Sequence, residues 1–103
     1  MARKLSRGKK FSVAVASWKA EFTPEARRQF GRLDRSVQRR IQTYLNENVL
    51  AGDPRRFGRA LRGDLSGLWR YRVGDFRLIA KLEDAILTVV IIKTGHRSVI
   101  YED

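Results

Sequence analysis

The residues best suited to chemistry are three arginines on a predicted β-hairpin. Arg70, Arg72 and Arg77 alternate with apolar residues over residues 69–82, so they share one face of the two strands. A two-residue Gly-Asp turn with glycine first is typical of type II′, and it places Arg72 directly opposite Arg77. A guanidinium binds phosphate through paired hydrogen bonds and can stabilise charge that develops at a scissile phosphate. The hairpin therefore predicts a phosphate-binding face.

Two arginines that face each other across a hairpin repel, and two interpretations of this face stay open. In one, a polyanion binds between the guanidinium groups and offsets their charge. In the other, the arginines splay apart into water, as on an ordinary solvated face. The opposite face of the hairpin is apolar and predicts packing on helices. Its side chains are Trp69, Tyr71, Val73, Phe76, Leu78, Ala80 and Leu82.

A second candidate lies near the C-terminus. RNA cleavage without a metal requires a base for the 2′-OH proton, a cation for the phosphorane and an acid for the leaving 5′-oxygen. His96 is the only histidine, the residue type that exchanges protons near neutral pH, and it follows the last predicted strand. A lone loop histidine is usually a surface residue, but Arg97 and Tyr101 lie close by in the sequence. Tyr101 can stack on a base or close the edge of the core.

Composition limits the partners and excludes several kinds of site. The 103 residues suffice for one domain, and the formal net charge of +11 predicts an acidic partner: nucleic acid, an anionic membrane surface or an acidic protein. The absence of cysteine excludes disulfides and thiolate metal sites, and a single histidine excludes a multi-histidine site. No apolar run is long enough to cross a bilayer. We therefore expect no metal, no cofactor and no membrane span, and a cytoplasmic location.

The first sixteen residues differ in composition from the rest. Residues 1–10 carry five basic side chains and no acidic one, and residues 11–16 form a short apolar stretch that ends in Ala-Val-Ala. This stretch is shorter than the apolar region of a signal peptide. We therefore predict a disordered basic arm over residues 1–16 and one folded domain over residues 17–103.

Hydrophobic periodicity predicts a strand and two helices before the hairpin. Residues 18–22 read as a strand, and Thr23 and Pro24 supply the cap and first residue of a helix. Asp34 or Ser36 can cap a second amphipathic helix, which a Gly-Asp-Pro sequence ends. Two consecutive helices with a short link predict an antiparallel helical hairpin.

The second half of the chain predicts a sheet. Residues 55–67 read as a linker, because they are rich in charge and glycine and show little periodicity. Residues 85–92 are almost all apolar or β-branched, which is typical of a central strand buried on both faces. The elements together predict an α+β fold with a two-helix hairpin packed on a small twisted, mainly antiparallel β-sheet.

Three segments, in this order, resemble the RelE/ParE toxin superfamily, and the match covers residues 18–101. They are F-T-P-E-A-R-R-Q-F-G-R-L-D, L-R-G-D-L-S-G-L-W-R-Y-R-V-G-D-F-R-L-I and G-H-R-S-V-I-Y. The resemblance implies a RelE-like, microbial-ribonuclease-type fold. It also implies a type II toxin that cleaves mRNA in the ribosomal A site without a metal, leaving a 2′,3′-cyclic phosphate and a 5′-hydroxyl. The implied partners are the ribosome with its mRNA and a cognate antitoxin, which is normally acidic or amphipathic.

The resemblance also implies roles for individual residues. Arg70 and Arg72 match two basic residues of the active-site strand, and Arg77 matches the arginine that stabilises the transition state. Arg97 and Tyr101 match an arginine and a tyrosine near the C-terminus. In a related YoeB-like branch a histidine near the C-terminus is used, and His96 looks like its counterpart.

The sequence departs from the family at the general base. The strand positions at Arg70 and Arg72 are lysines in the best-known RelE, and arginine is a poor base because it stays protonated. The YoeB-like branch has a glutamate near the position of Arg59. Either the strand arginines act only electrostatically, or His96 takes part in proton transfer. Two other functions remain as alternatives: a ParE-like protein that poisons DNA gyrase by binding, and a nucleic-acid-binding module without catalysis.

Overall fold

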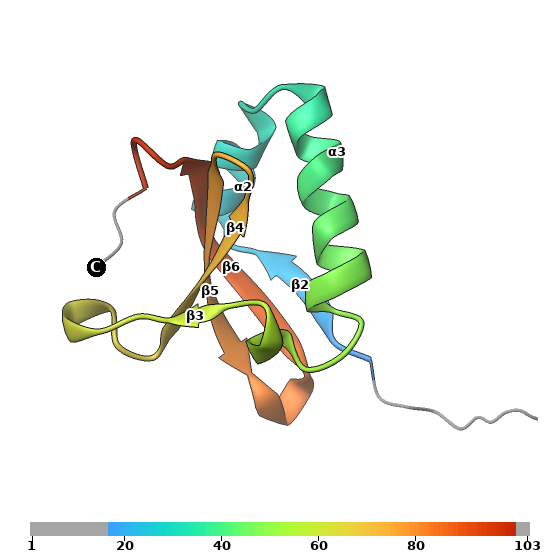
Figure 1. Cartoon of the computed structure of the whole chain (residues 1–103), viewed down its shortest axis with the longest axis vertical. Helices are drawn as coiled ribbons and strands as arrows, with labels where there is room; N and C mark the ends of the chain where they lie inside the picture. The colour runs from blue at the N-terminus through green and yellow to red at the C-terminus, as the bar shows by residue number, and fades with distance from the viewer. Residues whose placement is uncertain (1–16, 101–103) are drawn as a thin grey trace, which may run out of the picture.

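The structure is a computed structural model that describes residues 17–100 (Figure 1). One five-stranded sheet has the order β2-β6-β5-β4-β3, and two helices pack on it. The elements are β2 (Lys19–Phe22), α2 (Pro24–Gly31), α3 (Arg35–Tyr44), β3 (Arg59–Ala60), β4 (Leu68–Val73), β5 (Phe76–Glu83) and β6 (Thr88–His96). The predicted α+β fold is confirmed. The predicted arm over residues 1–16 lies outside the described residues, and the domain boundary at residue 17 stays a prediction.

The two helices begin where the sequence predicts. The hydroxyl of Thr23 accepts a hydrogen bond from the Ala26 N–H at 3.2 Å, and Pro24 is the first residue of α2. This arrangement satisfies one of the N–H groups that every helix start leaves without an intrahelical partner. Helix α3 begins directly after Asp34. Within residues 17–100, no helix is both long and apolar enough to span a membrane.

Helix α3 continues into a π-helical turn over Leu45–Val49. The Leu50 N–H donates to the carbonyl of Leu45 at 2.8 Å, five residues back, which marks the wider turn. Both ends of the turn, Leu45 and Val49, are buried in the core. The turn therefore keeps two apolar side chains against the sheet before the chain leaves the helix.

Strand β6 lies between β2 and β5 and is central, as predicted, but its predicted bounds were wrong. It pairs in parallel with β2 and antiparallel with β5, and it runs over residues 88–96. Residues 84–86 form a 3-10 turn instead, and Leu87 has a left-handed φ of 48°. Ile86 is 62% exposed. An apolar sequence run does not reveal a turn inside it, because periodicity carries no signal when every residue is apolar.

The predicted linker also contains regular structure. Pro54–Arg56 and Gly63–Leu65 are 3-10 turns, and β3 between them pairs antiparallel with β4 at the edge of the sheet. A two-residue strand is too short to show a period of two, so the sequence pattern missed it.

The sheet has a hydrophobic cluster on each face. The larger cluster joins the helices to the predicted apolar face of the hairpin, where Tyr71, Leu78 and Ala80 are fully buried. The smaller cluster has Leu61, Ile79 and Ile100 as its buried members, apart from the larger cluster. The apolar face of the hairpin was therefore predicted correctly, while its other face is partly apolar as well as basic.

Candidate active site

The hairpin of β4 and β5 has the predicted register. Arg72 pairs with Arg77, and Val73 pairs with Phe76 on either side of the turn. Gly74 has a φ of +60°, while Asp75 has no positive φ, which is the pattern of a type II′ turn. The two arginines are thus opposite each other on the face that points away from the helices.

A second arginine pair lies beside the first. Strand β3 pairs with β4 so that Arg59 is opposite Arg70. Four arginines from three neighbouring strands, here called the arginine face, therefore share one side of the sheet: Arg59, Arg70, Arg72 and Arg77. In the sequence, Arg59 stood out only because the YoeB-like branch has a glutamate near its position. Its place in the cluster depends on β3, which has no periodic signal.

The members of the arginine face differ in how firmly they are held. Arg70 is only 9% exposed and Arg77 only 7% exposed, while Arg59 and Arg72 are exposed. The Nη1 atom of Arg77 donates to the carbonyls of Gly74 and Phe76, both at 3.0 Å. These bonds fix the guanidinium against the turn, so an anion that binds it meets an oriented donor group.

His96 lies on the other face of the sheet. It pairs with Phe76, whereas Arg77 pairs with Gly95, and neighbouring residues of a strand point to opposite faces. The rings of Phe76 and His96 meet edge to face with centroids 5.5 Å apart. The structure therefore brings three predicted site residues together, Arg70, Arg72 and Arg77, and places His96 across the sheet from them.

A hydrogen bond sets the tautomer of the His96 ring. The backbone N–H of Ser98 donates to Nδ1 at 3.1 Å, and the Ser98 hydroxyl lies 2.8 Å from the same atom. Because a backbone N–H can only donate, Nδ1 is an acceptor and the proton of the neutral ring is on Nε2. His96 thus presents a donor beyond the end of β6.

Arg97 joins the segment after β6 to the hairpin turn. Its backbone N–H donates to the carbonyl of Asp75 at 2.7 Å, and its Nε lies 3.6 Å from the Asp75 carboxylate. This side chain is mostly exposed. The other predicted residue of this segment, Tyr101, lies outside the described residues.

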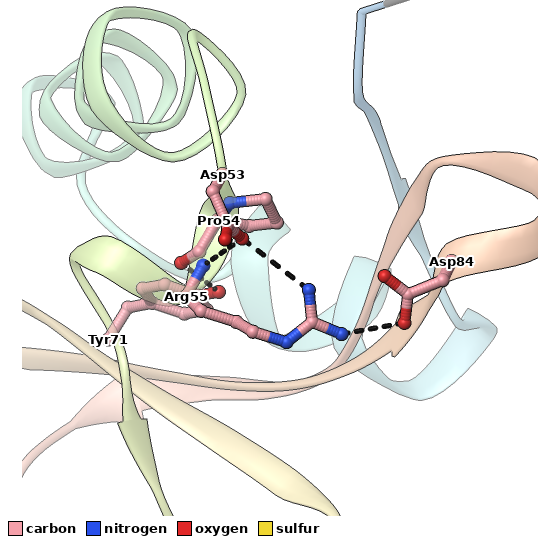
Figure 2. A network of polar contacts seen from close by, with 5 residues as sticks. All are labelled: Asp53, Pro54, Arg55, Tyr71 and Asp84. Atoms are coloured by element: carbon pink, nitrogen blue, oxygen red, sulfur yellow. Dashed lines mark hydrogen bonds and ion pairs between the residues drawn. The ribbon is translucent and has the colours of Figure 1, made fainter.

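A polar network holds β4 to the segment that leads into β3 (Figure 2). The Tyr71 hydroxyl donates to the carbonyl of Pro54 at 2.9 Å, and the Asp53 carboxylate accepts from the Arg55 N–H at 3.0 Å. The Arg55 guanidinium bonds to Asp84 at 2.6 Å, which raises the pKa of Arg55. The network ties the start of the β3 segment to the β5–β6 turn as well as to β4.

Gly58 completes this attachment. A Cβ atom there would lie 2.8 Å from the ring of Tyr71, closer than carbon atoms approach, so only glycine lets the chain pass over the ring. Arg59 follows directly. The position of Arg59 opposite Arg70 therefore depends on Tyr71 and on the chain that packs against it.

The described residues hold no evident metal site. Across residues 17–100, no three His, Asp or Glu side chains gather where they could bind a metal ion. The charged side chains that do cluster in this part of the chain are the arginines of the arginine face. The chemistry that the arginine face offers is binding and charge stabilisation of an anion with several oxygens, such as a phosphodiester.

Several known proteins that this chain resembles are named as toxins. The family model for the ParE toxin of type II toxin–antitoxin systems matches residues 20–101. Toxin RelG of Mycobacterium tuberculosis is 34% identical over 80 residues, covering 78% of this chain and 91% of the relative. The RelBE2 toxin–antitoxin complex of the same organism contains a chain with a TM-score of 0.73 and 29% identity, which covers 80% of this chain and 100% of that chain.

A third similarity concerns the fold alone. The isolated E. coli RelE toxin superposes with a TM-score of 0.62 at 19% identity, covering 79% of this chain and 84% of that one. The family model spans most of the chain, and the RelG match spans most of both proteins. This chain therefore belongs to the RelE/ParE superfamily of toxins of type II toxin–antitoxin systems.

Proposed function

We propose that this protein is a ribosome-dependent endoribonuclease that cleaves mRNA in the A site, leaving a 2′,3′-cyclic phosphate and a 5′-hydroxyl. The observation that carries the proposal is the arginine face, with two arginine pairs on three adjacent strands. Like charges placed opposite each other destabilise a sheet, and a phosphate chain bound between them reverses that cost. The relatives named RelG and RelE support a RelE-type target.

The cations have distinct roles in this proposal. Arg77, held against the turn, binds the scissile phosphate and stabilises the phosphorane. Arg72, directly opposite, binds a non-bridging oxygen of the same phosphate, and the nearly buried Arg70 holds the chain one step further along β4. These steps use charge and hydrogen bonding alone, since a guanidinium is not a base near neutral pH.

In the same proposal, a residue at the end of β6 donates the proton to the leaving group. In its imidazolium form, His96 gives the Nε2 proton to the leaving 5′-oxygen, while the Ser98 hydroxyl, 2.8 Å from Nδ1, accepts from the proton on that nitrogen. RNA that crosses the end of the sheet at the β4–β5 turn would reach both Arg77 and His96, with Arg97, which bonds to the turn residue Asp75, beside it. Tyr101 follows this segment in the sequence. The 2′-OH proton then passes to water or to a ribosomal group, because the arginines cannot accept it.

The proposed protein partner is a cognate antitoxin. The structurally similar RelBE2 chain is part of a toxin–antitoxin complex. A net charge of +11 favours an acidic partner, and covering the arginine face with carboxylates would relieve the repulsion between its members. Such a partner would also keep RNA away from Arg72 and Arg77.

The test of this function is a cleavage assay on purified ribosomes that carry mRNA positioned in the A site. We expect the protein to cut within the A-site codon and to leave 5′-hydroxyl and 2′,3′-cyclic phosphate ends, which differ in their reactions with kinase and ligase. Arg39→Ala, which removes one exposed arginine from α3, serves as the charge control and should cut normally. Growth arrest without any cut would contradict the proposal.

The second candidate is inhibition of DNA gyrase, because the matching family model is described as ParE. A gyrase poison acts by binding and leaves covalent gyrase–DNA breaks after expression. Breaks of this kind, together with intact A-site mRNA, would favour this candidate. A nucleic-acid-binding module without catalysis would give neither breaks nor cuts.

Phosphate binding by the arginine face also predicts a particular salt dependence. Arg72→Ala is expected to lower the slope of log affinity against log salt by about 0.7 to 1 for a single-stranded RNA oligonucleotide, since one phosphate contact is lost. Fluorescence anisotropy at several salt concentrations measures the slope. Arg39→Ala removes the same charge from α3. Equal slopes for the two variants would mean that Arg72 contributes only to the overall field.

A further inference from the structure

An apolar hollow of about 260 Å³ lies on the same side of the sheet as the arginine face. Its apolar walls are Leu65, Leu68, Ile79, Ile92, Val99 and Ile100. Ile79 is directly opposite Arg70 and two residues beyond Arg77 on β5, so all three side chains lie on the same side of the sheet. The hollow and the arginines are thus parts of one surface.

The far wall of the hollow reaches toward Arg77 from β6. Gly95 is directly opposite Arg77, and a Cβ atom on Gly95 would lie 3.3 Å from both Val99 and Ile100. The segment after β6 therefore folds back over this side of the sheet. Val99 nevertheless remains 72% exposed, so the hollow is open at that rim.

We propose that this hollow is a nucleobase subsite, which seats one base of the RNA whose phosphate is bound by Arg70 and Arg77. A nucleotide combines a flat ring of low polarity with a phosphate, and the two kinds of surface stand side by side here. Aliphatic side chains sandwich bases that have left a stack, as in enzymes that extrude a nucleotide. The proposal rests on the proposed action on RNA, and it adds a site for the base.

The size and the rim of the hollow fit one base. Pockets for drug-sized ligands span about 300 to 1,000 Å³, so this smaller space suits a single ring system. Gln29 and Lys93 are its polar lining residues. The Gln29 carboxamide oxygen already accepts from the Thr94 N–H at 2.9 Å, which leaves the amide NH₂ as the group to meet a polar edge of the ring.

The test measures binding to the full-length protein by methyl NMR. Each of the four nucleoside 5′-monophosphates is titrated in turn, and ribose 5-phosphate serves as the probe without a base. We expect nucleotides to shift the methyl signals of Ile79, Ile92 and Ile100, and at least one to bind about tenfold tighter than ribose 5-phosphate, because stacking adds affinity per base. Equal affinities, or unshifted methyls, would overturn the subsite and leave the hollow as a seat for an apolar side chain of a protein partner.

A matched pair of variants locates the effect. Val99→Trp fills the open rim of the hollow, while Ile86→Trp adds the same ring at a similarly exposed position in the β5–β6 turn. Val99→Trp should lose the tenfold difference in affinity between a nucleotide and ribose 5-phosphate, and Ile86→Trp should keep it. If Val99→Trp kept this difference in affinity, the base would bind elsewhere and the assignment would be refuted.

The binding assay needs no ribosome, so it separates the subsite from the nuclease function. Base-dependent binding without ribosomal cleavage would support the subsite and refute the endoribonuclease. Cleavage by wild type with no base-dependent binding would support the endoribonuclease and refute the subsite. When the wild-type protein shows both base-dependent binding and ribosomal cleavage, Val99→Trp should also change which A-site codons are cut, while Ile86→Trp should not.

Discussion

Arg77→Ala is expected to lower the rate of A-site mRNA cleavage by about 100- to 1,000-fold, the loss typical of removing one donor that stabilises transition-state charge. Arg77 is the member of the arginine face whose guanidinium is fixed by two carbonyls, so its stabilisation needs no rearrangement when charge develops. Single-turnover cleavage with saturating ribosome complexes measures this step directly. Binding of the ribosome should change much less.

Loss of folding is the effect to separate from this result. Arg77 bonds to the turn carbonyls, so its removal can loosen the hairpin as well as the chemistry. Circular dichroism and urea unfolding of the variant establish whether the sheet persists. Arg39→Ala is the matched control for net charge. Cleavage by a folded Arg77→Ala protein at the wild-type rate would rule out the role given to Arg77.

Tyr71→Ala is expected to lower the free energy of unfolding by about 3 to 5 kcal/mol, which is a large part of the stability of a small domain. Tyr71 is fully buried in the larger core cluster, and its hydroxyl donates to the Pro54 carbonyl. Tyr71→Phe keeps the ring and removes only the donor, with an expected cost of about 1 to 3 kcal/mol for the carbonyl left without it. Urea denaturation checks both values.

Tyr71 also predicts a dependence of stability on pH. Burial raises the pKa of Tyr71 above its ordinary value of 10.0, with a smaller contribution from Tyr44. The folded protein then keeps a proton that the unfolded chain releases, so this contribution is complete below about pH 10 and falls as the pH rises further. The difference in stability between wild type and Tyr71→Phe should therefore shrink above pH 10. A constant difference up to pH 11.5 would contradict the assignment.

Tyr71 contacts the segment that leads to Arg59 of the arginine face, so its variants also have a structural readout in β3. Tyr71 packs against Gly58, and the next residue is Arg59. A folded Tyr71→Phe protein loses the attachment to Pro54 and should hold β3 less firmly beside β4. Faster amide exchange at Leu61, whose N–H donates to the Leu68 carbonyl of β4 at 2.9 Å, compared with the interior of β5, would report this loosening.

The sequence determined most of the central hairpin by itself. A period of two, with a Gly-Asp turn of fixed geometry, is local information, and it placed Arg72 opposite Arg77 and the apolar side chains toward the helices. The start of α2 was predictable for the same reason, since Thr23 and Pro24 act within one turn of the chain. The superfamily was also evident from segments that recur in this order.

Tertiary structure alone decided what lies beside the hairpin. The pairing of Arg59 with Arg70 depends on a two-residue strand held by the Tyr71 network, and no periodic pattern marks such a strand. The separation of His96 from Arg77 follows from the register between β5 and β6, which contains an irregularity at Ile79 and Ala80. The bounds of β6 and the apolar hollow depend in the same way on contacts between distant segments. Local sequence carries turn type and alternation, whereas the register between strands that no tight turn joins is set by packing across the whole sheet.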